Sequence, residues 1–279
     1  EPVRIVDMSW YEAIILGILQ GITEFLPISS SAHLFIVSQF FGWTDPGAAF
    51  TAVSQIGTEL AVIVYFWRDI TRIVSTWSRS LRNPVLRKEL DARMGWYVIV
   101  GTIPVAALGF LLADQIETTA RNLYLVASTL IFFGVLLGIA DRYGRKIKSI
   151  EKLKLPDAVA FGLGQALALI PGVSRSGATI TTGLALGFNR VAATRYAFLL
   201  AIPAVLGSGF YEATKISDQQ NVAWGQTILA TVIAFFVGLV VISWLLRWLT
   251  TRTYTPFVIY RVGLGIVVLL LLATGVLSP

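Results

Sequence analysis

The sequence predicts an all-α integral membrane protein, and three observations carry that prediction. First, 56% of the 279 residues are hydrophobic and only 14% are charged, whereas an average soluble domain has about 25% charged residues. Second, several apolar runs approach the ~20 residues that a helix needs to cross a bilayer. Third, these runs lack the alternating pattern of barrel strands, and helices satisfy their backbone polar groups internally. We therefore expect one polytopic membrane domain over residues 1–279.

Six uninterrupted apolar segments have the length of a membrane-spanning helix. Each is separated from the next by polar or charged residues, so each is expected to be a separate span. They cover residues 50–67, 95–113, 122–140, 196–213, 225–246 and 257–277.

Two further apolar regions, 10–43 and 158–188, are interrupted. Pro27 and the serines after it break the first region, and the segment from Pro171 to Gly177 breaks the second. Each region divides into pieces of roughly 10–16 residues, a length typical of re-entrant segments. Unwound backbone at membrane depth must be buried in protein or line a wet cavity. We therefore expect two re-entrant helix–loop–helix hairpins whose breaks meet or line a pocket.

The same order of elements occurs twice, as repeat one over about residues 8–140 and repeat two over about 156–279. Gln20 precedes Pro27 and its serines much as Gln165 precedes Pro171 and the serines after it. An odd number of spans separates equivalent points, so the second repeat is expected to be inverted in the membrane. Hairpins that enter from opposite faces can bring their tips together near the midplane.

The positive charges indicate how the chain is oriented. Most of the 22 Lys and Arg residues fall in 68–93 and 141–157 or beside other spans, and cytoplasmic loops are enriched in these residues. We interpret both stretches as cytoplasmic loops and the net charge of +6 as a membrane-protein feature, with no nucleic acid as partner. The first apolar run lacks the basic region of a cleavable signal peptide. Residues 1–7 precede Met8, a candidate native start.

The second break, PGVSRSGAT over residues 171–179, has the composition of an anion site. Ser174 or Ser176 can cap the following half-helix, whose first N–H groups and positive dipole end favour a negative ligand. Arg175 adds a planar fork suited to phosphate oxygens. The alternative is a loop whose arginine points to water. We predict a phosphate cradle, distinct from a Walker loop, formed by Ser174, Arg175, Ser176, Gly177, Ala178 and Thr179.

The first break, QGITEFLPISSSAH over residues 20–33, contains a carboxylate, hydroxyls and the only histidine. Gln20 and Glu24 share one helix face at i and i+4, and His33 lies in the first turn of the next half-helix. A carboxylate within a membrane is expensive and marks a functional site by default. Two interpretations stay open: Glu24 and His33 take part in chemistry, or Glu24 is a structural partner of Arg175 and His33 is only packed. Further candidate binding residues here are Gln20, Ser29 and Ser31.

Two more ionisable residues fall inside predicted spans. Glu59, one turn after Gln55, either lines the site together with that glutamine or pairs with an arginine. Arg261 is either a structural counter-charge or a side chain that reaches the membrane interface.

Together these groups favour phosphoryl transfer. A serine of the first break or His33 can attack phosphorus, His33 or Glu24 can move protons, and Arg175 with the helix dipoles can stabilise charge. With a diphosphate bound, the site would be net negative, so we expect a divalent cation, Mg²⁺ or Ca²⁺, with Glu24 as a ligand. The chain has no cysteine and one histidine, which excludes a Cys or His metal cluster.

At these residues the sequence resembles the bacterial undecaprenyl-diphosphate phosphatases, the bacitracin-resistance family. The two breaks are its strongest marks, and the resemblance covers essentially the whole chain. The resemblance implies a membrane enzyme that hydrolyses the diphosphate of a polyprenyl carrier lipid to the monophosphate and phosphate. It also implies recycling of the carrier for cell-wall synthesis, bacitracin resistance and dependence on a divalent cation. Supporting segments are QIGTELAVIVYFWR (55–68), GTIPVAALG (101–109), FLLAIPAVLG (198–207) and PFVIYR (256–261).

The family's functional residues fall on matching positions of this chain. Its acidic motif falls on Gln20 and Glu24, and its catalytic serine, histidine and arginine fall on Ser30, His33 and Arg175. Gln20 stands where many members have glutamate, so we interpret it as a hydrogen-bonding residue. The sequence does not choose between Ser30, His33 and an activated water as the nucleophile.

The resemblance further implies inverted repeats with two re-entrant hairpins in the bacterial plasma membrane, and a site that opens to the outer face. The expected partners are a polyprenyl diphosphate and the bilayer, with a homodimer also considered. The main rival is a lipid flippase or small-anion transporter on the same scaffold. A purely structural membrane protein leaves the intramembrane Glu24, His33 and Arg175 unexplained.

Overall fold

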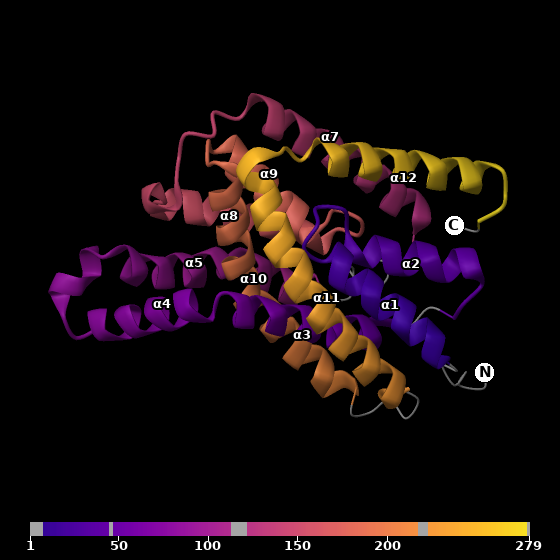
Figure 1. Ribbon diagram of the computed structural model, residues 1–279, viewed down its shortest axis with the longest axis horizontal. Helices are drawn as coiled ribbons and strands as arrows, with labels where there is room; N and C mark the ends of the chain where they lie inside the picture. The colour runs from indigo at the N-terminus through magenta and orange to yellow at the C-terminus, as the bar shows by residue number, and fades with distance from the viewer. Residues whose placement is uncertain (1–7, 45–46, 113–121, 217–222, 278–279) are drawn as a thin grey trace.

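The computed structural model describes residues 8–44, 47–112, 122–216 and 223–277, and this part of the chain is helical (Figure 1). Within it the only β-type pairing is an isolated bridge between Lys148 and Phe188. The all-helical prediction is therefore confirmed, whereas residues 1–7 lie outside the described part. The helices are α1 (Trp10–Thr23), α2 (Ser30–Phe41), α3 (Gly47–Tyr65), α4 (Trp67–Ser80), α5 (Leu90–Leu111), α7 (Leu123–Tyr143), α8 (Leu155–Ala166), α9 (Arg175–Ala185), α10 (Arg190–Ile216), α11 (Trp224–Thr251) and α12 (Thr255–Ala273).

Several of these helices suit a membrane. Among the described residues, α5, α7, α10, α11 and α12 are long and apolar enough to cross one. Helices α3 and α4 are bent by 77° at a short break and form a sixth candidate. Each predicted span thus corresponds to an apolar helix, although residue 113 lies outside the described part. The last span ends earlier than expected, at Ala273, and Gly275 follows in a left-handed turn with φ +73°.

The structure also differs from the sequence prediction over residues 68–93, which were expected to form a loop but are largely helical. This stretch contains α4 and a 3₁₀ helix, Pro84–Lys88, and α4 lies along α5 (Figure 1). Trp77 packs where Gly95 of α5 has no side chain, and Arg72 bonds Asp91 of α5 at 2.7 Å. The many arginines of this stretch indicated a loop, but its other residues give α4 one apolar face. Such a face is sufficient for a helix to pack against a neighbour.

Two helix–turn–helix units, α1–α2 and α8–α9, occupy the two interrupted regions. Each second helix follows a serine with positive φ: Ser29 has φ 74° and ψ 100°, and Ser174 has φ 69° and ψ 114°. Residues other than glycine seldom adopt positive φ, and such strain gathers at functional sites. The two turns therefore have the same unusual backbone geometry.

Glycines hold both units against long helices. The unit α1–α2 packs on α11, where a Cβ on Gly17 would lie 2.7 Å from the Ala230 carbonyl oxygen. The unit α8–α9 packs on α5, where a Cβ on Gly162 would lie 2.3 Å from the Gly101 carbonyl oxygen. Small residues permit such close backbone approach between membrane helices. These contacts fix both units in the bundle and set the position of their turns.

Candidate active site

The turns of the two helix–turn–helix units meet. Ser176 lies at the start of α9, and its hydroxyl is 3.2 Å from the carbonyl oxygens of both Glu24 and Leu26 in the first turn. Ser176 is buried, so these bonds form away from solvent. The predicted meeting of the two breaks is thus present in the structure, over a sequence separation of about 150 residues.

Arg261 of α12 forms hydrogen bonds to both of these turns. Its guanidinium donates to the carbonyl of Pro27 at 3.1 Å, to that of Gly172 at 2.9 Å and to that of Val173 at 2.5 Å. It also donates to Leu130 of α7 at 2.9 Å. The side chain is fully buried. The interpretation that this side chain reaches the membrane interface is therefore wrong. As a structural counter-charge, the other interpretation, Arg261 bonds backbone carbonyls, and no described carboxylate forms an ion pair with it.

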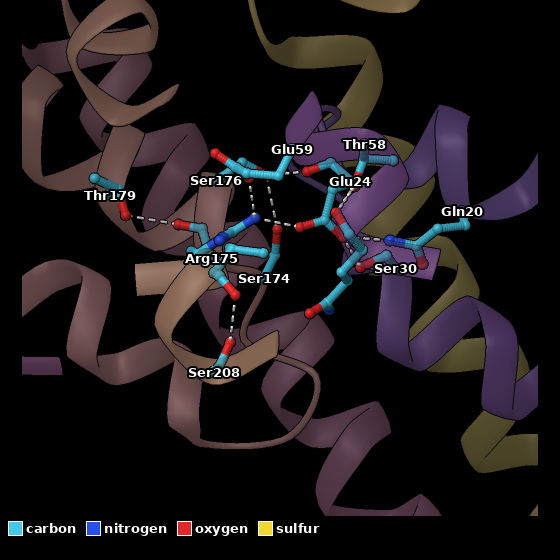
Figure 2. A network of polar contacts seen from close by, with 12 residues as sticks. Gln20, Glu24, Ser30, Thr58, Glu59, Ser174, Arg175, Ser176, Thr179 and Ser208 are labelled. Carbon is cyan, nitrogen blue, oxygen red and sulfur yellow. Dashed lines mark hydrogen bonds and ion pairs between the residues drawn. The ribbon is translucent and has the colours of Figure 1, made fainter. Parts of the chain in front are cut away.

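Glu24 is the centre of a network that contains both breaks (Figure 2). One oxygen, Oε1, accepts from Nη2 of Arg175 at 2.5 Å. The other, Oε2, accepts from Nε2 of Gln20 at 2.9 Å and from the hydroxyl of Ser30 at 2.5 Å. Glu24 is thus both the ion-pair partner of Arg175 and in direct contact with a hydroxyl that can act as a nucleophile. Gln20 acts here as a hydrogen-bond donor, the role that the family resemblance implied for it.

A second carboxylate lies on the other side of Arg175. Glu59 of α3 places Oε2 3.7 Å from Nη2 of Arg175, and the side chain is 1% exposed. Its Oε1 has no hydrogen-bond partner among the described residues. Glu59 therefore satisfies both sequence interpretations, since it lines the cluster and pairs with an arginine. The carbonyl of Gln55, one turn earlier, accepts from the hydroxyl of Thr58 at 2.8 Å.

The start of α9 is organised as a capped helix terminus. The Ser174 hydroxyl accepts from the N–H of Gly177 at 3.1 Å, and the Ser174 carbonyl accepts from the N–H of Ala178 at 2.9 Å. The Thr179 hydroxyl donates to the carbonyl of Arg175 at 2.7 Å. Of the predicted cradle, Gly177, Ala178 and Thr179 thus serve the helix itself. The guanidinium of Arg175 and the N–H groups of Arg175 and Ser176, the first two of α9, are the donors left for a ligand.

His33 lies apart from this network. Its Nδ1 is 2.7 Å from the Ser29 carbonyl, and its Nε2 is 2.8 Å from the hydroxyl of Tyr260 on α12. Among the described residues no hydrogen bond joins His33 to Glu24, Ser30 or Arg175. The Ser29 and Ser31 hydroxyls are 3.4 Å apart. Sequence reasoning overlooked Tyr260; the only available signal was its position in the segment PFVIYR.

A hard cation fits the chemistry of this site. The described residues contain no group of three His, Cys, Asp or Glu side chains arranged around a metal. However, Glu24 and Glu59 supply carboxylates, and Oε1 of Gln20 and Oε1 of Glu59 are buried acceptors without partners. Oxygen donors of this kind suit Mg²⁺ or Ca²⁺. The two carboxylates cancel the charges of Arg175 and Arg261, so the negative charge of a diphosphate would be uncompensated.

A cavity of about 680 Å³ lies elsewhere, and its described lining includes Arg72, Arg190 and Arg195. These arginines already pair with carboxylates: Arg190 with Asp141 at 2.5 Å and Arg195 with Asp69 at 2.6 Å, besides the bond of Arg72 to α5. None of its lining residues belongs to the Glu24 network. The cavity and the Glu24 network are therefore separate features of the described structure.

The fold and site define a class: a multi-pass helical membrane protein with a buried cluster of carboxylate, hydroxyl and guanidinium groups. The family model of the bacitracin resistance protein BacA matches residues 13–267, and the chain belongs to that family. It is 58% identical over 276 residues to the undecaprenyl-diphosphatase of Micrococcus luteus, covering 97% of this chain and 100% of the relative. It is 57% identical over 272 residues to the undecaprenyl-diphosphatase of a Nocardioides species, covering 97% and 99%. Undecaprenyl-diphosphatase 2 of Streptomyces coelicolor is 53% identical over 284 residues, covering 98% of each chain.

Proposed function

We propose that this protein hydrolyses undecaprenyl diphosphate to undecaprenyl phosphate and inorganic phosphate, and thereby returns the carrier lipid for cell-wall synthesis and confers bacitracin resistance. One observation carries the proposal: the Ser30 hydroxyl and the Arg175 guanidinium both bond the buried carboxylate of Glu24 where the two turns meet. Relatives that match almost the whole chain at 53–58% identity are named undecaprenyl-diphosphatases. A flippase or anion transporter leaves the contact between Ser30 and Glu24 without a role.

The proposed arrangement in the membrane has six spans and two re-entrant hairpins, α1–α2 and α8–α9, related by an inverted repeat. Two observations support it. Ser29 and Ser174 both have positive φ, and the first helix of each hairpin packs on a long helix of the other repeat, α1 on α11 and α8 on α5. The protein would lie in the bacterial plasma membrane with its site open to the outer face. The prenyl tail would stay in the bilayer while the diphosphate reaches Arg175. The homodimer stays a prediction.

The proposed chemistry begins at Ser30. Its hydroxyl proton passes to Oε2 of Glu24, which is 2.5 Å away, while the serine oxygen bonds the terminal phosphorus. The bridging P–O bond breaks and undecaprenyl phosphate leaves. Arg175 uses one of its five N–H donors for Glu24, so the others can hold phosphate oxygens and stabilise the developing charge. Water then attacks the phosphoserine, the bond from phosphorus to the serine oxygen breaks, and Oε2 of Glu24 returns its proton to that oxygen. The proton of the water passes to Nε2 of His33, whose Nδ1 bonds the Ser29 carbonyl.

The test is phosphate release from undecaprenyl diphosphate by the purified protein in lipid nanodiscs. We expect release from wild type and a phosphate label on Ser30 when the reaction is quenched early. Ser30→Ala should abolish both, whereas Ser78→Ala, on the exposed side of α4, should change neither. Transport of the lipid across vesicles without phosphate release from wild type would exclude the proposal.

We further propose that Glu24 and Glu59 hold a divalent cation. The cation would neutralise the diphosphate when bound. Chelation should abolish phosphate release, and Mg²⁺ or Ca²⁺ should restore it. Glu59→Gln should raise the cation concentration for half-maximal activity about tenfold, because a charged oxygen ligand becomes a neutral one. Binding of Mn²⁺ measured by electron paramagnetic resonance should weaken in parallel, and the exposed Glu89→Gln should bind as wild type does. Activity that survives exhaustive chelation would contradict the cation.

A further inference from the structure

The single histidine has both ring nitrogens bonded. Nδ1 lies 2.7 Å from the carbonyl oxygen of Ser29, and Nε2 lies 2.8 Å from the hydroxyl of Tyr260. The two rings are also stacked, with centroids 5.6 Å apart and planes 13° from parallel. His33 on α2 is therefore held both by its own turn and by α12, which comes 227 residues later.

These two partners determine which nitrogen carries the proton. A carbonyl oxygen only accepts hydrogen bonds, so Nδ1 bears the hydrogen. In the neutral imidazole Nε2 then carries the lone pair, and the Tyr260 hydroxyl donates to it. Nε2 is the one atom of His33 that can take up a proton, and Tyr260 lies directly against it.

The backbone of Tyr260 is held in place by its neighbour in α12, whereas its side chain is partly exposed. The next residue, Arg261, is fully buried and bonds carbonyls of both turns, which anchors this part of α12 to the site. Tyr260 itself is 48% exposed. Its hydroxyl can therefore hold Nε2 in the resting protein and yield that position to water without disturbing the core.

We infer that Tyr260 is a positioning residue for the reaction, and this inference rests on the proposed function. The Tyr260 hydroxyl orients the imidazole of His33 with Nε2 unprotonated, so that Nε2 is ready when water attacks the phosphoserine. In that step the water oxygen bonds phosphorus, the bond from phosphorus to the serine oxygen breaks, Oε2 of Glu24 returns its proton to the serine oxygen, and the proton of the water passes to Nε2. Tyr260 acts through His33 and forms no bond to the substrate.

Because His33 is the only histidine, nitrogen NMR of ¹⁵N-histidine-labelled protein in nanodiscs reports this residue alone, provided that the purification tag contains no histidine. Wild type should show a protonated Nδ1 and an unprotonated Nε2 whose resonance is shifted by hydrogen bonding. Tyr260→Phe keeps the stacked ring and removes the hydroxyl, so the Nε2 resonance should move to the value of an unbonded nitrogen. Tyr124→Phe, at an exposed tyrosine of α7, should leave the spectrum unchanged.

The same variants separate positioning from binding in the kinetics. Tyr260→Phe should lower kcat for phosphate release about tenfold with KM nearly unchanged, because a misoriented base slows the step without weakening the substrate complex. An unchanged Nε2 resonance in Tyr260→Phe, or an unchanged kcat despite a shifted resonance, would overturn the inference. Wild type without phosphatase activity would contradict the proposed function alone, since the resonance is read without substrate.

Discussion

Replacing Arg175 with lysine should lower phosphate release by about 100-fold or more, the usual cost of losing a preorganised donor to a developing charge. The guanidinium contacts Glu24 at 2.5 Å and lies 3.7 Å from Glu59, and still has donors for a phosphate. An ammonium has the charge but no planar fork, so it cannot hold a carboxylate and two phosphate oxygens in one plane. The measurement is kcat for phosphate release at saturating undecaprenyl diphosphate.

The matched control is Arg82→Lys, at an exposed arginine outside the spans, which should keep full activity. Glu24→Gln should also be inactive, because it removes the negative charge that pairs with Arg175 and the base that takes the Ser30 proton. The loss in Arg175→Lys should occur with an unchanged unfolding temperature, since the side chain is partly exposed. Phosphate release from Arg175→Lys at the wild-type rate would remove Arg175 from the proposed mechanism.

Replacing Arg261 with methionine should have the largest effect on stability. The substitution removes donors from the carbonyls of Pro27, Leu130, Gly172 and Val173. The Leu130 carbonyl lies inside α7 and keeps its helical position, whereas the carbonyls of the two turns lose a donor, and each buried acceptor left without a partner costs roughly 1–3 kcal/mol. We therefore expect the apparent unfolding temperature to fall by at least about 10 °C, at 2–4 °C per kcal/mol for a chain of this size. Phosphate release should be lost as well, because both turns lose the group that holds them together.

Arg261→Lys should be only slightly better than Arg261→Met, since one ammonium cannot reach three segments of the chain at once. The control is Arg247→Met at an exposed position of α11, which should unfold at the wild-type temperature. The measurement is thermal unfolding in detergent, followed by tryptophan fluorescence. An Arg261→Met variant with wild-type stability and activity would show that the four carbonyl bonds are dispensable.

Much of the site was predictable because its residues are chemically conspicuous in an apolar sequence. Glu24, Ser30 and Arg175 are polar groups at breaks in hydrophobic runs, where their desolvation cost requires a partner or a function. The structure brings these three together. His33 was predicted beside them, but the structure bonds it to Ser29 and Tyr260 instead.

What the sequence missed depends on contacts that no local pattern encodes. Arg261 lies in an apolar run that gives no sign of its partners, which are backbone carbonyls from three distant segments. Helix α4 was missed because its high density of charged residues indicated a loop. A helix can pack in the fold with only one apolar face, provided that another helix offers a matching surface. The surface is supplied by Gly95 and its neighbours on α5, far along the chain.

By itself, the sequence determined the helical membrane class, the two breaks and the chemical groups at each break. Hydrophobic length and the cost of burying charge are local properties, and they can be judged from residues close in sequence. Only the tertiary structure decided that Ser30 rather than His33 contacts Glu24, and that Arg261 and Tyr260 complete the site. Hydrogen bonds act over about 3 Å, so their partners are settled only when helices more than 200 residues apart in sequence pack together.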